Sequence, residues 1–515
     1  MSNQIGGASV ADSLRDARVA VKSAHYDAAL TLLDGCEDWP REHAEDGIVL
    51  KADVVGRRDP VGALAYLSSV NDIPTSERGR FGLAIAFGKA HAAVRNFTQA
   101  ELHYEDARTL MHAAPNGAHT MAYHDLRMRW FRRECDPIAP DVALAVQHPD
   151  PSIASAAFAY RAWLHAGKGD YRSHVADLCR AVEFATMRTD EPVDVATLAA
   201  STHALTQVAF ETADTDGMAA ARRAFTALAW TPDVHTHHFL TVRALGWDAF
   251  MRGRPAEAQW TFRDARALAR NAPSRVMAHA DRAYVARMSR NDFWAAEELA
   301  QADALAYEIR WESLFSEERQ VLVMLAVLHA ANDAPRAQRY AAMYSQVGTE
   351  NVDPALALHD DPRAVAHARY AQGRIDQTLG RTAAAIANLH AAYETFAASS
   401  FRYRATLTAT ALAELTGETS WREIALEHAN AYRDCPLVTM ADEAAAREDA
   451  MPAHLSPLQR QLARAVWAGA DNAELSRRFS RSVYTIERQI DAILTAFGVS
   501  SRLELLEEAR RRELV

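Results

Sequence analysis

The pattern of apolar and polar positions repeats many times along the chain. A turn residue or an aromatic residue precedes a phrase Ala-x-x-x-apolar, which has the spacing of one face of a helix. Successive phrases start 34 to 47 residues apart, except for one gap of 74 residues. A fixed period of this length predicts a helical repeat. The phrases begin at Tyr26, Pro60, Phe97, Tyr171, Gly217, Pro255, Phe293, Pro335, Thr382 and Trp421.

The length of the period fits a pair of helices. About 38 to 40 residues accommodate two helices of about 12 to 16 residues and two short turns, and such a pair buries its apolar stripes only against neighbouring pairs. The gap of 74 residues equals two periods, so a further repeat is expected between Met111 and Asp150, with an irregular loop around 135–140. The pattern predicts ten or eleven stacked helix pairs in an all-α superhelix.

The repeated phrase resembles the second helix of a tetratricopeptide unit, where a small residue lets two helices approach closely. The period exceeds the roughly 34 residues of that family, and the family's Trp-x-x-Leu-Gly-x-x-Tyr opening is absent. A divergent tetratricopeptide-like array is therefore expected over residues 13–450, after a flexible N-terminus at 1–12. The resemblance implies a concave face for a peptide, protein or small-molecule effector of unknown identity. A generic α-α superhelix that binds no ligand is the alternative.

A different pattern follows the segment 451–454, Met-Pro-Ala-His, which interrupts the repeat and is expected to be a linker. Four residues with capping side chains each precede a short helical stretch: Ser456, Asp471, Ser482 and Ser501. Gln or Glu stands three places after three of them, at Gln459, Glu474 and Glu504, as in a capping box. One apolar face of the third stretch comprises Ile486, Ile490, Ile493 and Phe497. Short helices with a free outer face on the third are typical of a helix-turn-helix that enters the major groove of DNA.

Residues 455–515, about an eighth of the chain, resemble the LuxR-type DNA-binding domain, also called FixJ-like or NarL-like, of bacterial transcriptional regulators. The matching residues are Leu455-Ser456-Pro457, Arg460, Gly469, Asn472, Glu474-Leu475, Ser482, Thr485-Ile486, Gly498-Val499 and Arg502. The resemblance implies a four-helix fold, a third helix in the major groove of an inverted-repeat site, and a homodimer formed through the fourth helix. Region 4 of bacterial sigma factors shares this fold, but the ending Gly498-Val499-x-x-Arg502 favours the LuxR type.

The resemblance assigns ten residues to DNA contact: Arg477, Arg478, Arg481, Ser482, Tyr484, Thr485, Glu487, Arg488, Gln489 and Asp491. Arginine offers paired donors for phosphate and guanine, although solvated surface positions are the alternative for Arg477 and Arg478. Leu503, Leu506 and Arg510 are expected at the dimer contact.

Two acidic residues on the third stretch weaken the case for DNA. Glu487 and Asp491 occupy positions where the family has basic or polar residues, and a carboxylate beside a phosphate opposes binding. A scaffold or adaptor protein whose degenerate helix-turn-helix contacts protein instead of DNA is therefore the second interpretation.

The distribution of charge restricts any DNA contact to the C-terminal region. The formal net charge is −11, but residues 455–515 hold ten Arg, no Lys and eight Asp or Glu, which gives +2 and leaves −13 for the remainder. An acidic body does not attract nucleic acid.

Catalytic, nucleotide and metal motifs are absent from the sequence. It contains no Gly-x-x-x-x-Gly-Lys-Ser/Thr, no Gly-x-Ser-x-Gly and no His-Glu-x-x-His, so no enzyme activity, cofactor or metal is expected. The cluster His235, His237 and His238 follows Pro232 and is expected to mark a helix start. Four widely spaced cysteines indicate reduced thiols, and no apolar run reaches the ~18 to 20 residues of a membrane span. The N-terminus has no secretion signal, so a cytoplasmic transcriptional regulator is the leading interpretation.

Overall fold

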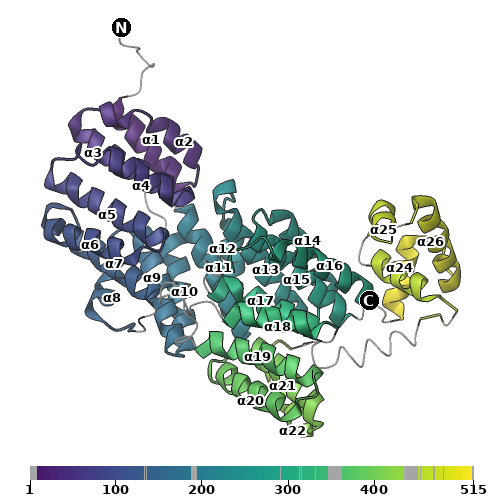
Figure 1. Ribbon diagram of the computed structural model, residues 1–515. Coiled ribbons are helices and arrows are strands. Elements are labelled where there is room, and N and C mark those ends of the chain that lie inside the picture. The colour runs from purple at the N-terminus through teal and green to yellow at the C-terminus, as the bar shows by residue number, and fades with distance from the viewer. Residues whose placement is uncertain are drawn as a thin grey trace. The chain divides into compact units, whose positions relative to one another are not determined.

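The computed structural model describes residues 9–512 except 133, 135, 187–193, 290, 312, 313, 315, 331, 346–361, 434, 436–450, 453, 468, 469 and 480. Every regular element in these ranges is a helix, so the fold is an all-α superhelical repeat, as the sequence predicts (Figure 1). The contacts divide the chain into two compact units. The boundary lies within the middle repeats, and each unit is described separately below.

The first unit contains six helix pairs. They are α1 (Val10–Lys22) and α2 (Tyr26–Leu32), α3 (Arg41–Arg58) and α4 (Pro60–Ser69), α5 (Glu77–Ala93) and α6 (Phe97–Leu110), α7 (Gly117–Phe131) and α8 (Pro140–Ala145), α9 (Pro151–Gly167) and α10 (Tyr171–Thr186), α11 (Val195–Thr212) and α12 (Thr215–Ala227). Short 3₁₀ turns η1 (Cys36–Asp38), η2 (Met111–Ala113) and η3 (Pro232–Val234) join some of them.

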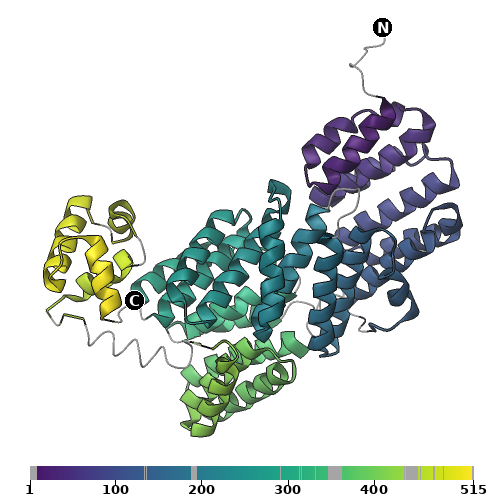
Figure 2. The same cartoon turned by 180° about the vertical axis from the view of Figure 1, so that it is seen from behind.

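In its described residues, the second unit holds five further pairs, except for the start of the first helix up to Thr241, and then four helices. The pairs are α13 (His235–Met251) and α14 (Pro255–Leu268), α15 (Ala272–Met288) and α16 (Asp292–Ala306), α17 (Ser316–Ala330) and α18 (Ala334–Ser345), α19 (Pro362–Thr378) and α20 (Thr382–Ala398), α21 (Arg402–Thr416) and α22 (Thr419–Asn430). The last four are α24 (Pro457–Trp467), α25 (Asn472–Arg478), α26 (Val483–Phe497) and α27 (Arg502–Arg511). Figure 2 shows the same stacked pairs from behind.

The predicted repeat phrase marks the second helix of each pair. All ten predicted starts fall within the first three residues of a second helix, from Tyr26 in α2 to Trp421 in α22. The repeat expected between Met111 and Asp150 is α7 with α8, and its second helix has only six residues. A helix of this length is too short for the repeated phrase Ala-x-x-x-apolar with its preceding turn residue. The interval between phrases in the sequence is therefore about two periods long at this place.

The first helix starts earlier than the sequence predicts. Ser9 caps α1 by accepting a hydrogen bond from the Asp12 amide, and the Asp12 carboxylate accepts one from the Ser9 amide in return. This capping box begins the helix at Val10, so the repeat region starts three residues before the predicted residue 13. Residues 1–8 lie outside the described range.

Close packing within the pairs depends on small residues in the first helix. A Cβ atom added to Gly88 of α5 would lie 2.4 Å from the Tyr104 ring of α6, and one added to Gly246 of α13 would lie 2.8 Å from the Phe262 ring of α14. A real side chain does not fit at such distances. The glycines therefore let a large ring of the second helix lie directly on the first helix.

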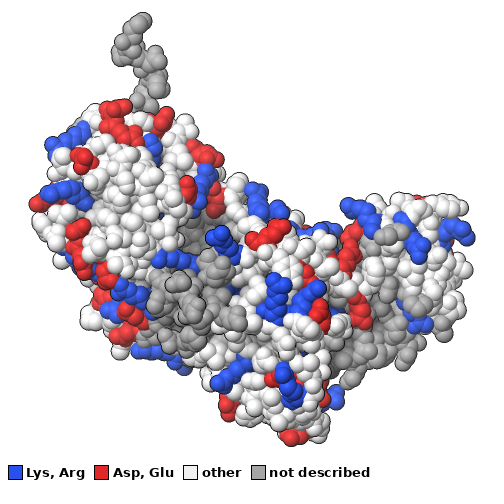
Figure 3. All heavy atoms as spheres, viewed as in Figure 1, with Lys and Arg blue, Asp and Glu red and all other residues white. Residues whose placement is uncertain are grey.

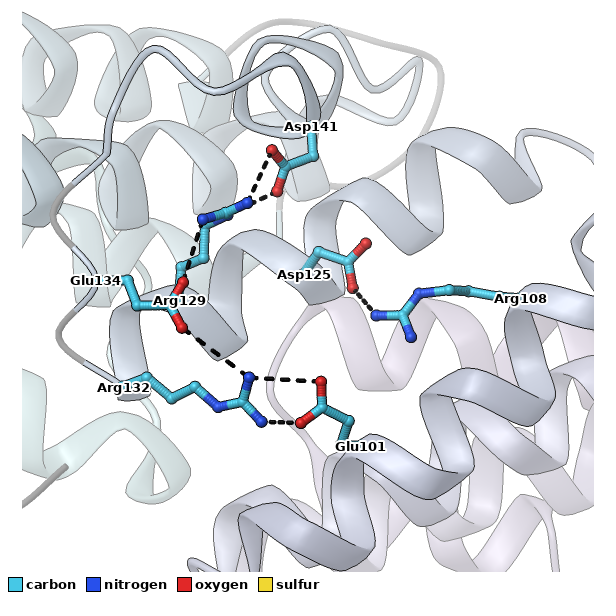
Figure 4. Close-up of polar contacts among 7 residues, drawn as sticks. All are labelled: Glu101, Arg108, Asp125, Arg129, Arg132, Glu134 and Asp141. Carbon is cyan, nitrogen blue, oxygen red and sulfur yellow. Dashed lines mark hydrogen bonds and ion pairs between the residues drawn. The ribbon is translucent and has the colours of Figure 1, made fainter. Parts of the chain in front are cut away.

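Ion pairs add to the packing where the second helix is shortest. Figure 4 shows Arg129 of α7 donating to Asp141 of α8 at 2.8 Å and to Glu134 at 3.1 Å. Across the other interface, Arg108 of α6 donates to Asp125 of α7 at 2.6 Å. These contacts attach α7 to the helices on both sides of it.

The first unit winds far enough for its first pair to meet its last pairs. Arg58 of α3 forms an ion pair with Asp233 at 2.6 Å, and the same carboxylate accepts a hydrogen bond from the Tyr26 amide at 3.4 Å. Arg57 approaches Asp194, just before α11, at 4.0 Å. One apolar cluster accordingly joins residues of α1 to α3 with residues of α9 to α12.

Candidate nucleic-acid interface

The four helices α24 to α27 share one apolar core. The buried residues of this core come from all four helices: Leu462, Ala463, Ala465, Leu475, Ile486, Ile490, Ile493, Phe497, Leu505 and Ala509. Met451 and Leu455 join the same core before α24 begins. Met451 belongs to the predicted linker 451–454, so the structured region begins before residue 455, because an apolar side chain in this linker completes the core.

Helix caps form at the predicted residues. Ser456 and Gln459 exchange side-chain to amide hydrogen bonds of 2.9 and 3.2 Å, which completes one capping box. Asp471 accepts from the Glu474 amide at 2.7 Å and begins α25. Gly469, expected to end the helix before it, lies outside the described residues.

The third and fourth helices are capped by serines. Ser482 accepts from the Thr485 amide at 3.1 Å, and Ser501 accepts from the Glu504 amide at 3.2 Å. The Glu504 carboxylate bonds to the amide and hydroxyl of Ser500 instead of Ser501, so the predicted reciprocal bond is displaced by one residue. Gly498, with φ of 71°, ends α26 in the left-handed conformation.

Helix α26 has one buried and one exposed face. The predicted apolar stripe Ile486, Ile490, Ile493 and Phe497 is confirmed, since these are its buried residues. The opposite face meets solvent, and Tyr484 keeps 69% of its surface exposed. The predicted DNA-contact residues that are exposed are Arg477, Arg481, Ser482, Tyr484, Glu487, Arg488 and Asp491, whereas Thr485 and Gln489 are half-buried. The Arg478 side chain lies outside the description.

The exposed face carries arginines that no described carboxylate neutralises. Arg481 and Arg488 form no ion pair with the described part of the chain, and Arg477 makes only a 3.4 Å hydrogen bond to the Ala473 carbonyl. Glu487 accepts a hydrogen bond of 3.3 Å from Asn472, whose side-chain oxygen accepts in turn from Arg502. Figure 3 shows several blue side chains on the visible face of this four-helix region.

The outer side of α27 is also open. Leu503 keeps 67% of its surface exposed, and Arg510 is exposed. Leu506 is half-buried, while Leu505 and Ala509 face the core. The three residues predicted for the dimer contact therefore lie away from the core, where a second copy of the chain can reach them.

The end of α25 contacts the repeats of the second unit. The Phe479 ring stacks on the Phe293 ring of α16, with centroids 4.8 Å apart and planes inclined by 7°. Beside this contact, Ala470 and Glu474 line a hollow together with Trp260, Arg282 and Trp294 of α14 to α16. The local sequence does not predict this contact, because Phe293 and Phe479 lie far apart along the chain.

The histidine cluster has structural roles. Helix α13 begins at His235, as predicted, and the His235 ring contacts the Pro232 carbonyl at 2.7 Å. His238 stacks on Trp230 with centroids 4.0 Å apart. Within the described ranges, no group of histidine, cysteine and acidic side chains is arranged to hold a metal ion. Nor does any described helix combine the length and apolarity needed to cross a bilayer.

No protein-family model matches this chain, and no curated protein matches its sequence. The assignment of residues 455–515 to a family of DNA-binding domains therefore stays a prediction from the sequence.

Proposed function

We propose that this protein is a LuxR-type transcriptional regulator that binds double-stranded DNA through the outer face of α26. The repeats would bind the effector or partner that controls it, and α27 would join two copies on an inverted-repeat site. The observation that supports the proposal is the exposed face that carries Arg481, Tyr484 and Arg488, two of them cations without a described counter-charge. Guanidinium groups in that setting bind phosphate and guanine edges.

The charge on this face sets the expected strength of binding. Arg477, Arg481 and Arg488 face Glu487 and Asp491, which leaves one net positive charge per copy. Each phosphate neutralised by an arginine contributes about −0.9 to the slope of log affinity against log salt. Two copies with three such contacts each therefore give a slope no steeper than about −5. One net positive charge per copy gives little nonspecific electrostatic affinity for DNA. Tight binding to a particular site must therefore come from contacts to its bases.

The test uses the full-length protein and DNA fragments selected by it from a genomic library. Wild type should bind a selected duplex with an affinity that falls as salt rises. The double change Arg481→Gln and Arg488→Gln should weaken binding at least tenfold, because each lost phosphate or base contact costs about 1 kcal/mol or more. Glu487→Gln should strengthen it.

Arg80→Gln is the matched control, because Arg80 is an exposed arginine of α5 without an ion pair in the described chain. This variant should bind DNA as wild type does. Absence of duplex binding at low salt, or equal binding by the double variant and wild type, would contradict the proposal.

A second candidate function is an adaptor whose α26 contacts protein. The exposed Glu487 and Asp491 favour it, since two carboxylates on a reading helix repel phosphate. Changing both to Lys separates the two functions. If wild type ignores all DNA and the variant gains only nonspecific binding, the adaptor function is supported and the regulator is not.

A further inference from the structure

The interior of the first unit contains an arginine with no carboxylate partner. Arg127 of α7 forms no ion pair with any carboxylate that the structure describes. Its electrostatic neighbours are the hydroxyl groups of Tyr104, Tyr123 and Tyr160, which come from α6, α7 and α9. A half-buried guanidinium group set among tyrosine hydroxyls without a carboxylate keeps a charge that an anion can pair with.

The arginines around the same helix are arranged differently. Arg108, Arg129 and Arg132 each have a carboxylate within reach, as Figure 4 shows. Arg129 has two, Asp141 at 2.8 Å and Glu134 at 3.1 Å, and Arg132 pairs with Glu101 and approaches Glu134 at 4.0 Å. Among these arginines, Arg127 is the one that lacks a carboxylate partner in the described part of the chain, and it lies instead over the Phe131 ring at 5.2 Å.

A glycine lets Tyr104 reach this position. The ring of Tyr104 lies across Gly88 of α5 and stacks on His124 of α7, with centroids 5.1 Å apart. Tyr104 is only 1% exposed, yet its hydroxyl has no hydrogen-bond partner, and neither has Nδ1 of the buried His124. Buried polar atoms normally find a partner. Burial raises the pKa of Tyr104 to about 12, so its hydroxyl stays protonated and can donate a hydrogen bond.

The neighbouring charges leave the interior positive. Asp53 accepts from Lys89 and, at 3.1 Å, from Arg57, which also approaches Asp194 at 4.0 Å. The two carboxylates, Asp53 and Asp194, are thus outnumbered by three cations, Lys89, Arg57 and Arg127. Burial, together with the charges of Lys89 and Arg127, holds the pKa of His124 well below its usual value, so the imidazole is neutral at physiological pH.

The cluster is accessible from outside the fold. The Lys89 side chain keeps 37% of its surface exposed and that of Asp53 keeps 18%. Tyr123, Arg127 and Tyr160 are half-buried. Tyr123 and Tyr160 lie with ring centroids 6.0 Å apart and provide an aromatic wall beside the guanidinium group. A cation and an aromatic wall thus lie close together in this cluster.

We propose that Arg127, Tyr104, Tyr123 and Tyr160 form a binding site for a small organic acid whose single carboxylate pairs with Arg127. The planar guanidinium fork matches the two oxygens of a carboxylate, and the tyrosine hydroxyls donate to the same oxygens. The one uncompensated positive charge fits a monoanion better than the divalent phosphate ion. Only the biological role of the site, as the effector site of the regulator, rests on the proposed function. Anion binding and DNA binding are measured separately, so either can fail alone.

The experiment is thermal unfolding of the full-length protein in sodium benzoate and in sodium chloride at equal ionic strength. Benzoate should raise the unfolding temperature of wild type above the value in chloride, because a ligand that binds only the native state stabilises it. Acetate should act more weakly, since it lacks the ring that packs on the tyrosines, and inorganic phosphate should act less than benzoate. A larger effect of phosphate than of benzoate would overturn the carboxylate assignment.

Two variants separate a ligand site from a structural role. Arg127→Gln should lose the benzoate effect and unfold at the same temperature as wild type in chloride or higher, because it removes a half-buried charge that has no carboxylate partner. Tyr160→Phe keeps the ring, loses one donor, and should weaken benzoate binding about threefold to tenfold. The control Arg80→Gln should respond to benzoate as wild type does. An Arg127→Gln protein that benzoate still stabilises, or a wild type that responds no more to benzoate than to chloride, overturns the proposal.

Discussion

Gly88 and Gly56 are both helical glycines of the first unit, but an added methyl group would meet very different surroundings. At Gly88 the new Cβ would lie 2.4 Å from the Tyr104 ring, while at Gly56 the nearest atom is the Ala63 Cβ at 3.5 Å. Gly88→Ala should lower the free energy of unfolding by about 1 to 3 kcal/mol through overpacking. Gly56→Ala should raise it by up to about 1 kcal/mol through helix propensity.

Urea unfolding of the two variants and wild type measures this difference. The two changes are chemically identical, so a shared effect on the unfolded chain cancels in the comparison. Equal stability of the two variants would show that the Tyr104 ring is free to move, and the argument for its fixed hydroxyl would then fail.

Individual residues differ in how well the sequence predicts their roles. The caps at Ser456, Asp471 and Ser482 and the buried stripe of α26 could be predicted, because capping and helix periodicity act over three or four residues. Arg127 was not singled out. Its tyrosine neighbours come from three helices, and nothing in the local sequence shows that a carboxylate will be missing.

At the scale of helix pairs, one buried carboxylate joins α15 to α16. Glu298 of α16 contacts His279 at 2.7 Å and Arg282 at 2.9 Å, both on α15, and it accepts from the Trp294 indole at 3.1 Å. Burial opposes the ionised form, but the His279 hydrogen bond and the Arg282 charge outweigh it and lower the pKa of Glu298. Ionised Glu298 therefore stabilises the pair.

The lowered pKa of Glu298 predicts a pH dependence of a definite sign. The stabilisation is complete above the carboxyl pKa of the unfolded chain, about 4.3, and is lost as the pH falls through the lower folded value. Glu298→Gln should cost about 3 to 5 kcal/mol at pH 7, because it leaves the Arg282 guanidinium, whose side chain is only 10% exposed, without its counter-charge. The difference in free energy of unfolding between wild type and this variant should become smaller below about pH 4. If unfolding experiments show the same difference in free energy of unfolding from pH 7 to pH 3, this account is contradicted.

Helix α26 depends on the serine that caps its N-terminus. Ser482→Ala removes the hydrogen bond to the Thr485 amide and should lower the free energy of unfolding of the four-helix region by about 1 kcal/mol. Ser482→Gly is the matched control, since glycine at a helix start costs only a few tenths of a kcal/mol. Trp467, whose ring lies 5.9 Å from that of Phe497 in this core, reports the transition by fluorescence. A glycine variant less stable than the alanine variant would mean that the cap contributes nothing.

At the scale of the whole molecule, the chain is too long for one cooperative core. Its contacts form two compact units, and repeat arrays gain stability mainly from neighbouring pairs. Calorimetry should therefore resolve two transitions. Gly88→Ala should shift the transition of the first unit alone, and Glu298→Gln that of the second unit alone. A single transition that moves with both changes would show one cooperative array.

The sequence by itself determined the all-α repeat, the phase of the helix pairs, and the residues that cap the last four helices. These features follow from periodicity and capping, which neighbouring residues establish without distant contacts. Only the tertiary structure decided that Met451 completes the last core, that Phe479 stacks on Phe293, and that Arg127 lies among tyrosines without a counter-charge. Each of these depends on side chains distant in the sequence, because burial and charge compensation are set by the helices that pack around a residue.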